Sequence, residues 1–438
     1  MSQKSRRVMT AALPLSLAAA LALTGCGASG SSVEGSPDSG DLNVQVYGDW
    51  PFVQAAADSF MKEHPDAKIK VGGITNEQMR ESGGRLFTSS DAPDVVSYTL
   101  QDAYMEDWIA AGALQPLDDV WKENDLESVV SGTTVDLATA SDGKKYSVPV
   151  ALTLLPYVYM DTEQWASFGG AAPDPETHTF ASVDEFSDSL QAAKDAGLTP
   201  LSVPGNPFVE YLFGSLLQTS CGTDLYTEIS TNWQKGGEKS AEYTDPCVVN
   251  ALEQLGEWGE KGYFAQGVDS LTFEQSQTLF DTQKSPTWIM GSWVPPVYEP
   301  EGFTWDWALF PSLGDEPTAH GVSLDSFLVP QGAKNPELAK SFISYLTSKA
   351  VVEDGMNKVP AREDVDLSKV IESPILTSIV EQYQTAPQAP GWFTMLPASV
   401  EQEFSESVVS GVMSGRVSAK DAAAALQDAA STYREQHS

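Results

Sequence analysis

Four residues near the ends of two predicted strands have side chains suited to holding a ligand: Asp49, Trp50, Tyr98 and Asp102. An aromatic ring offers a flat apolar face, and a carboxylate accepts hydrogen bonds. The first strand is predicted from the alternation of Leu42, Val44 and Val46 with polar residues, and the second from the apolar run 93–98. In open α/β sheets, ligands bind beyond the carboxyl ends of the strands. These four residues are therefore candidate ligand-binding residues.

Motifs for catalysis and metal binding are weak in the sequence. The four histidines are scattered without metal-ligand spacing: His64, His178, His320 and His437. Residues 321–325 lack the closing glycine of a nucleophile elbow, and the Ser-x-x-Lys match at 141–144 lies in an Asp-Gly turn without its companion motifs. We therefore expect no enzyme, no metal and no cofactor. A secreted glycosidase using two of the 61 acidic residues stays open as an alternative.

The elements that carry the first candidates alternate between strand and helix. Apolar residues recur at helical spacing over 52–61, and His64 followed by proline ends that helix. A second strand is predicted at 69–71, and 102–111 reads as a helix that Gly112 ends. This order predicts an α/β body with a mainly parallel sheet.

The rest of the chain predicts further elements of both kinds. They are a crossover at 146–160, a helix at 183–197, a polar, loop-like segment at 221–247, a helix at 248–262, a strand entering a turn at 288–293, a strand at 324–330, a helix with Asn335 as N-cap and Pro336 in its first position, and a capping box at 418–421.

The composition is that of an acidic globular protein. Of 438 residues, 41% are hydrophobic and 11 are tryptophan, which favours a packed body of about two domains. The formal net charge is −36. A surface this acidic repels nucleic acid and anionic lipid, so neither is an expected partner.

The N-terminus has the features of a lipoprotein signal. Basic residues precede an apolar run at 11–23, which is shorter than the roughly 20 residues of a spanning helix. Residues 23–26 resemble the bacterial lipobox, which implies lipid on Cys26. We expect a signal peptide at 1–25, a flexible Gly/Ser-rich tether at 26–40, and a body anchored by lipid on the extracytoplasmic face of the cell membrane. An ordinary secretory signal with an incidental cysteine is the alternative.

The two remaining cysteines, Cys221 and Cys247, are then exposed to an oxidising environment, in which disulfides persist. We predict that they pair with each other. The alternative is two free thiols.

Six segments, taken in their order and spacing, resemble the family 1 extracellular solute-binding proteins of ABC importers, the group that contains the maltose-binding proteins. The segments are 48–49, 93–96 with 112–117, 143–149 with Tyr157 and Tyr159, 290–293, 335–340, and 414–416. Each segment alone is weakly specific. Their combination behind a lipobox carries the resemblance.

The resemblance implies an α/β fold of the type II periplasmic-binding-protein kind, in which hinge crossovers join two lobes around a ligand cleft. By that analogy the N-terminal lobe is 41–150 plus 324–360, and the C-terminal lobe is 151–323 plus 361–438. Such proteins deliver a captured solute, often a sugar, to a membrane permease. We therefore expect a small-molecule solute and ABC permease subunits as partners, and a monomeric protein.

A sugar has flat C–H faces and a rim of hydroxyls, which aromatic rings and acidic side chains recognise. The resemblance adds four ligand-binding candidates to the first four: Tyr157, Trp293, Asp325 and Trp392. Two departures argue against maltose itself, because Thr153 stands where the family pattern has a ligand-binding acid and Trp50 where it has a lysine. A structural lipoprotein without a small-molecule ligand is a further alternative.

Overall fold

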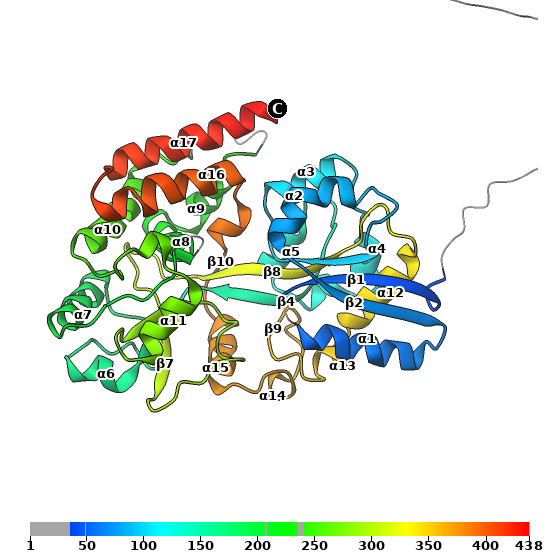
Figure 1. Ribbon diagram of the computed structural model, residues 1–438, viewed down its shortest axis with the longest axis horizontal. Coiled ribbons are helices and arrows are strands. Elements are labelled where there is room, and N and C mark those ends of the chain that lie inside the picture. Colours follow the sequence, from blue (N-terminus) through cyan, green and yellow to red (C-terminus); the bar gives the residue numbers. More distant parts are fainter. Residues whose placement is uncertain (1–35, 49, 206–207, 235–240, 438) are drawn as a thin grey trace, which may run out of the picture. The chain divides into compact units, whose positions relative to one another are not determined.

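The computed structural model describes residues 36–48, 50–205, 208–234 and 241–437, which belong to one compact unit (Figure 1). The predicted signal peptide, Cys26 and Asp49 lie outside the described residues. Within the described ranges, no helix combines the length and apolar character needed to cross a bilayer.

A seven-stranded mixed sheet carries the first elements of the chain. Its main path runs β2-β1-β3-β8-β4-β9, and β10 pairs with β8. The expectation of a mainly parallel sheet is wrong, because β8 runs antiparallel to both β3 and β4, whereas β1 is parallel to β2 and β3. The strands are β1 (Gly40–Tyr47), β2 (Ala67–Ile74), β3 (Val95–Tyr98), β4 (Val148–Leu155), β8 (His320–Leu328), β9 (Val359–Pro360) and β10 (Gln388–Pro390).

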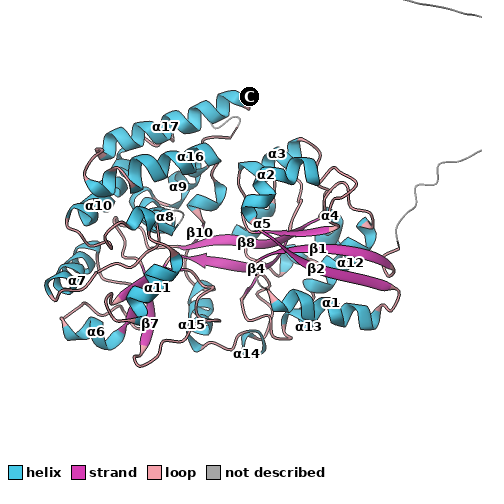
Figure 2. Cartoon of the chain, in the orientation of Figure 1, coloured by secondary structure: helices cyan, strands magenta, loops and turns pink. Residues whose placement is uncertain are grey.

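A second, antiparallel sheet has three strands in the order β6-β5-β7 (Figure 2). The chain leaves the large sheet at the end of β4, enters the small sheet at Tyr157, and later returns from β7 to β8. The outgoing passage lies inside the predicted crossover at 146–160. Since β4 and β8 are the outgoing and returning passes, they run in opposite directions. The small sheet contains β5 (Tyr157–Asp161), β6 (Thr287–Met290) and β7 (Trp305–Leu309).

Local sequence sets the starts of the first helices. The helix α1 has proline in its first turn and buries an apolar stripe that includes Val53 and Phe60. A capping box of Thr75 and Gln78 starts α2. Asp102 caps α3 by accepting a hydrogen bond from the Met105 amide. The helices are α1 (Pro51–Glu63), α2 (Asn76–Leu86) and α3 (Ala103–Ala110).

The remaining helical segments surround both sheets. They are α4 (Asp118–Glu123), η1 (Leu126–Ser128), α5 (Gly132–Ala138), α6 (Thr162–Ser167), α7 (Val183–Asp195), α8 (Phe208–Cys221), α9 (Thr223–Ser230), α10 (Pro246–Glu260), η2 (Val268–Ser270), α11 (Phe273–Asp281), α12 (Pro336–Leu346), α13 (Lys349–Val352), α14 (Leu367–Val370), α15 (Pro374–Tyr383), η3 (Trp392–Met395), α16 (Ala398–Glu403), the π-helical η4 (Phe404–Val409), η5 (Val412–Ser414) and α17 (Ala419–Gln436).

Buried apolar side chains form separate clusters. One cluster joins β1, α1 and α12 to the strands that pass between the sheets. A second packs α8, α10, α16 and α17 together and includes Trp258 and Phe404. A third, around Phe87 and Trp108, holds α2 against α3. The helices α2 and α16 therefore rest on different cores.

Three local predictions need correction. The segment 221–247 contains α9, because Tyr226 and Ile229 recur at helical spacing and are buried. Asn335 occupies the N-cap position, but its side-chain amide donates to the Asp41 carbonyl at 2.8 Å and caps nothing. Ser418 does cap α17, but the Asp421 carboxylate accepts from the Ser418 hydroxyl and does not reach the backbone amide that completes a capping box.

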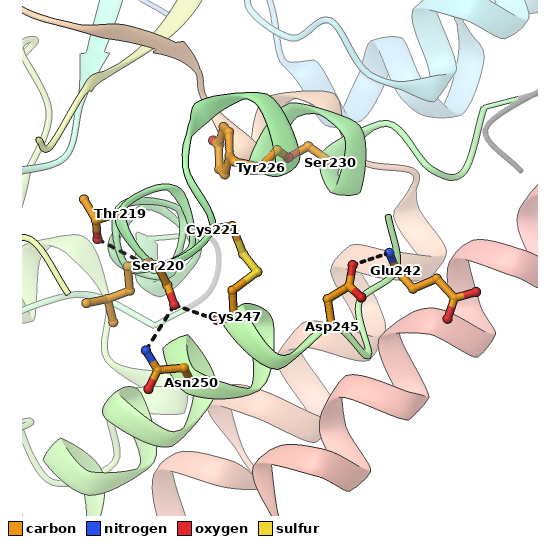
Figure 3. The surroundings of a disulfide bond; sticks show 10 residues. Thr219, Ser220, Cys221, Tyr226, Ser230, Glu242, Asp245, Cys247 and Asn250 are labelled. Carbon is orange, nitrogen blue, oxygen red and sulfur yellow. Dashed lines mark hydrogen bonds between the residues drawn. A yellow bond between two sulfur atoms is a disulfide. The ribbon is translucent and has the colours of Figure 1, made fainter. Parts of the chain in front are cut away.

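The predicted disulfide is present and joins the end of α8 to the start of α10 (Figure 3). The Cys221 and Cys247 Cα atoms are 5.1 Å apart. Beside the bond, the Ser220 hydroxyl donates to the Cys247 carbonyl at 2.8 Å and accepts from the Asn250 amide at 3.1 Å. These hydrogen bonds fix α8 against α10 independently of the sulfur bridge.

Replacing both cysteines by serine should lower the free energy of unfolding by about 3.5 kcal/mol. The bridge closes a loop with a sequence separation of 26, and this restricts the unfolded chain. Urea unfolding of the oxidised, reduced and Cys221→Ser/Cys247→Ser proteins measures the loss. The reducing agent should have no effect on the double variant, and equal stability of oxidised and reduced wild type would contradict the expectation.

Candidate functional site

Trp50 and Asp325, two of the predicted ligand residues, lie together because Lys358 joins them. The Lys358 Nζ lies 4.1 Å from the centroid of the Trp50 ring and 2.9 Å from Asp325 Oδ2. The Trp50 side chain is 8% exposed, and its Nε1 has no hydrogen-bond partner among the described residues. An ammonium group on an aromatic face beside a buried carboxylate is a stable arrangement for a cation.

Tyr47 and Thr153 lie beside the same carboxylate. The Thr153 hydroxyl donates to Asp325 Oδ1 at 3.4 Å. Tyr47, the last residue of β1, is 44% exposed. Burial raises the pKa of the Tyr47 phenol, and Asp325 raises it further, so the hydroxyl is neutral near pH 7. We call these five residues the Trp50 group: Tyr47, Trp50, Thr153, Asp325 and Lys358.

A second group consists of four half-buried aromatic rings from α8, η3 and the turn after β6. The Tyr211 ring centroid lies 4.3 Å from that of Phe393, 5.4 Å from Phe208 and 6.0 Å from Trp293. Burial raises the pKa of Tyr211 well above its ordinary value, so its hydroxyl is neutral. We call Phe208, Tyr211, Trp293 and Phe393 the Trp293 group.

The turn that carries Trp293 requires a glycine. A Cβ on Gly291 would lie 1.9 Å from the Trp293 ring, so the ring lies directly across the glycine. Ser292 then ties the turn to the end of β4, because its amide donates to the Leu154 carbonyl and its hydroxyl accepts from the Leu154 amide, both at 2.9 Å. The Gly-Ser-Trp sequence therefore fixes the direction of the indole.

Tyr98 and Asp102, also predicted ligand residues, form part of a buried ionic cluster around Arg80. Asp102 accepts from Arg80 Nε at 2.9 Å and from the Tyr98 hydroxyl at 2.8 Å. The other two guanidinium nitrogens of Arg80 donate to the two oxygens of Glu401 at 3.0 and 2.8 Å. Since Arg80 belongs to α2 and Glu401 to α16, the guanidinium connects helices that rest on different cores. We call Arg80, Tyr98, Asp102 and Glu401 the Arg80 group.

Electrostatics within the Arg80 group favour the ionised pair. Burial raises the pKa of the Asp102 and Glu401 carboxyls, and Arg80 opposes this shift in both. Burial lowers the pKa of Arg80, but the two carboxylates raise it by more, so the guanidinium keeps its charge. The result is a bidentate, charge-assisted contact between α2 and α16.

Glu210, in the first turn of α8, lacks hydrogen bonds of this kind. Its side chain is 0% exposed, and neither carboxylate oxygen has a hydrogen-bond partner among the described residues. Burial raises the pKa of this carboxyl well above its ordinary value of 4.5, Glu401 adds to the rise, and Arg80 opposes it. The carboxylate therefore lies within electrostatic range of the Arg80 group.

Charged and polar residues of the other groups act on Tyr211, which belongs to the Trp293 group. The charges that act on its phenol include Glu210 and Glu401, and the Tyr47 phenol acts on it as well. Phe208 and Trp293 pack against the core cluster that contains Trp50, and Phe393 packs against the cluster that contains Tyr98. Rings of the Trp293 group therefore lie against the cores that carry the other two groups.

Two predicted ligand residues lie elsewhere. Tyr157 is 0% exposed, its hydroxyl lies 2.7 Å from His320 Nδ1, and its ring packs edge-on against Trp307. Trp392 is 2% exposed and packs against Phe213 and Phe404 in the core beneath η3. Because both side chains are enclosed in the core, we do not include them in the site.

A separate hollow of about 370 Å³ lies between α3, α5 and α9. It is lined by Asp102 and by hydroxyl-bearing residues that include Thr133 and Thr227, but by none of the residues of the Trp293 group. It therefore adds no stacking surface to the site.

Sequence reasoning missed most of the side chains that complete the site. They are Tyr47, Arg80, Phe208, Glu210, Tyr211, Lys358, Phe393 and Glu401. Only Tyr47 carried a usable signal, since it lies at the end of the first predicted strand, two residues before Asp49.

Replacing Arg80 by methionine should destabilise the fold by about 3–5 kcal/mol, because the buried Asp102 and the largely buried Glu401 would both lose their cation. Urea unfolding measures this loss. The matched control is Lys340→Met, which removes a cation from the more exposed partner Asp119 and should change stability by less than about 1 kcal/mol. Similar losses of unfolding free energy in the two variants would contradict the claim that Arg80 stabilises the fold more than an exposed ion pair does.

Replacing Glu210 by glutamine should stabilise the protein near pH 8 by about 1–3 kcal/mol and change little near pH 4.5. The folded state holds the Glu210 proton more tightly than the unfolded state, because burial raises the pKa. Stability of the wild type is therefore lost as pH rises from about 4.5 through the raised pKa, whereas glutamine does not titrate. Unfolding free energies of both proteins across this pH range test the difference, and parallel pH curves would refute it.

Comparison with known proteins identifies relatives of the chain. A family model described as "Bacterial extracellular solute-binding protein" matches residues 49–353. A maltooligosaccharide ABC transporter solute-binding lipoprotein of Streptococcus pneumoniae is 24% identical over 449 residues, which cover 97% of this chain and 96% of that protein. An ABC transporter extracellular-binding protein of Pyrococcus horikoshii is 22% identical over 348 residues, or 76% of this chain and 73% of that protein.

Solved structures share the fold over nearly the whole chain. A chitin oligosaccharide binding protein superposes with a TM-score of 0.73 at 20% identity and covers 91% of this chain and 100% of its own. The GacH receptor of Streptomyces glaucescens gives a TM-score of 0.71 at 20% identity, with 91% and 99% covered. The fold is thus the two-lobe, type II fold of periplasmic binding proteins. Since the family model matches more than half of the sequence, the chain belongs to the bacterial extracellular solute-binding protein family.

Proposed function

We propose that this protein is the solute receptor of an ABC importer and that it binds a carbohydrate between its two lobes. The observation that supports this most is the cluster of half-buried aromatic rings in the Trp293 group, in a structure that also holds the paired charges of Asp325 and Lys358 against Trp50. Stacking rings beside hydrogen-bonding groups suit a sugar. The maltooligosaccharide lipoprotein among its relatives agrees with this ligand class.

Each group has a distinct part in the proposed site. Trp293 and Tyr211 offer ring surface to the C–H face of a sugar. Asp325 accepts from sugar hydroxyls, and Lys358 donates to them. Because Lys358 lies on the face of Trp50, stacking of a sugar on Trp50 requires the ammonium to move aside. We propose Asp49 as a further hydrogen-bonding residue, from its place after β1.

We propose that the lobes are 41–150 plus 324–360 and 151–323 plus 361–438. The passage from β4 to β5 and the return from β7 to β8 support a hinge between the two sheets. Residues on both sides contact the solute only when the lobes approach each other, so binding favours the closed state. The Arg80–Glu401 contact stabilises the same approach of α2 and α16.

We propose that the receptor is a monomer held at the outer face of the cell membrane by lipid on Cys26, where it meets the permease subunits. The lipoprotein relative from Streptococcus pneumoniae supports this arrangement. Binding without chemical conversion is part of the proposal.

A thermal-shift panel of mono- and oligosaccharides, polyols, phosphodiesters and short peptides tests the receptor function. A ligand at 100 times its Kd stabilises the fold by about 2.7 kcal/mol. We expect a clear shift with one class of sugar, and no new sugar product after hours of incubation. Absence of a thermal shift with every saccharide would overturn the proposal. Release of a new sugar product would favour the glycosidase alternative.

Replacing Trp293 by alanine should weaken binding of the sugar so identified by about 1–3 kcal/mol, because a desolvated stacking face is lost. Isothermal titration calorimetry measures the affinity. The matched control is Trp305→Ala on β7, which removes another half-buried indole that packs against Tyr159 and Tyr298. We expect the control to bind normally. Unchanged affinity of Trp293→Ala would exclude this indole from the site.

A further inference from the structure

The indole of Trp50 is a ring surface that the protein covers itself. Trp50 is 8% exposed, and the Lys358 Nζ lies 4.1 Å from the ring centroid. The ring of Phe327 is stacked with the indole at a centroid separation of 5.9 Å, and the ring of Phe52 lies at 5.7 Å. Little of the indole is therefore open to a ligand while Lys358 keeps this position.

A buried carboxylate holds the ammonium group of Lys358 on the indole. The Nζ lies 2.9 Å from Asp325 Oδ2, and Asp325 is only 4% exposed. The other described hydrogen bond to this carboxylate, from the Thr153 hydroxyl, is long at 3.4 Å. A displacement that uncovers the indole would weaken a buried ion pair and give up the cation–π attraction, and both changes are unfavourable.

The backbone on both sides of Lys358 is also fixed. The residue directly precedes β9, which pairs with β4. On its other side, the Asn357 backbone amide donates to the Val370 carbonyl at 2.8 Å. The Asn357 side-chain amide donates to the Pro296 carbonyl at 3.4 Å, three residues beyond Trp293. Lys358 is therefore held next to the turn that carries Trp293.

We infer that Lys358 is a specificity-determining residue, which keeps Trp50 closed to the solute and restricts the receptor to short saccharides of one or two units. The inference rests on the proposed function and narrows the substrate class of the same site. The Lys358 side chain is 30% exposed, so a sugar unit that reaches the Trp50 group meets an ammonium group instead of the indole. A longer chain stacked on the Trp293 group therefore gains no second stacking contact on Trp50.

Three series of saccharides with one to four units test the length preference by calorimetry. They are built from α-1,4-linked glucose, β-1,4-linked xylose and β-1,4-linked N-acetylglucosamine. In the series that binds, we expect the wild type to gain less than about threefold in affinity from the disaccharide to the tetrasaccharide. A further stacking contact on a ring would give a gain of about tenfold.

Two substitutions at the same position separate the cover from the charge. Lys358→Ala uncovers the indole, so the ratio of tetrasaccharide to disaccharide affinity should rise about tenfold. The matched control is Lys358→Arg, which keeps a cation between Trp50 and Asp325 and should keep the wild-type ratio. An unchanged ratio in Lys358→Ala would contradict the role of Lys358.

Nuclear magnetic resonance of wild-type protein with ¹³C-labelled lysine tests the position of Lys358 directly. Ring currents shift the signals of a side chain that lies on an indole, so we expect one lysine Cε signal upfield of the others. Its disappearance in Lys358→Arg assigns it. We expect this signal to stay upfield when each saccharide that binds is added to saturation. This measurement decides the matter even where Lys358→Ala impairs folding.

The outcomes separate this inference from the receptor function. A gain of tenfold or more with chain length in the wild type would overturn the inference and leave the receptor function standing. Movement of the Lys358 signal to the position of exposed lysines on saccharide binding would do the same. Absence of an upfield lysine signal in the unliganded protein would overturn the inference whether or not a saccharide binds. Absence of binding to every saccharide would instead reject the proposed function.

Discussion

The pairing of buried charge around Arg80 is the constraint on which much of this structure depends. The side chain of Asp102 is fully buried, and a carboxylate in such a place needs a cation or hydrogen-bond donors. Arg80, Tyr98 and the first turn of α3 supply them. The same guanidinium also binds Glu401. The ion pair that Asp102 requires therefore also holds α16, although α16 packs on a different hydrophobic core. The need to neutralise Asp102 thus places Arg80 where it also binds Glu401, 321 positions away in the sequence.

The two long strands β4 and β8 set the geometry within which that contact forms. They pair over most of their length, and both continue into the region of the small sheet. Asp325 lies near the middle of β8, and Thr153 lies on the neighbouring β4. The polar part of the site therefore lies on the strands that join the two sheets, whereas the aromatic part lies on α8 and on the turn after β6. A ligand between them contacts both.

The sequence predicted those features that depend on neighbours along the chain. The extent of α1 follows from its apolar stripe and from the stop at His64, and α3 lies within the helix predicted at 102–111. The partners of side chains could not be predicted, because Arg80 and Glu401 are 321 positions apart. Residue type also failed to separate Trp293 from Trp392: both follow glycine-containing turns, but only Trp392 is enclosed by the core around α8.

The same reasoning separates the acidic character of the surface from the charges of the buried acids around Arg80. Net charge of −36 creates a field that concentrates cations near the protein, but a field alone selects nothing. Selection requires a charge held in a fixed place with little water, where its interaction with a partner is strong. Asp102 and Glu401 do not provide this, because Arg80 already neutralises them. Glu210 does not provide it either, because burial raises the pKa of its carboxyl and favours the neutral, protonated form. Of these acids, none offers a fixed, unpaired negative charge to a ligand.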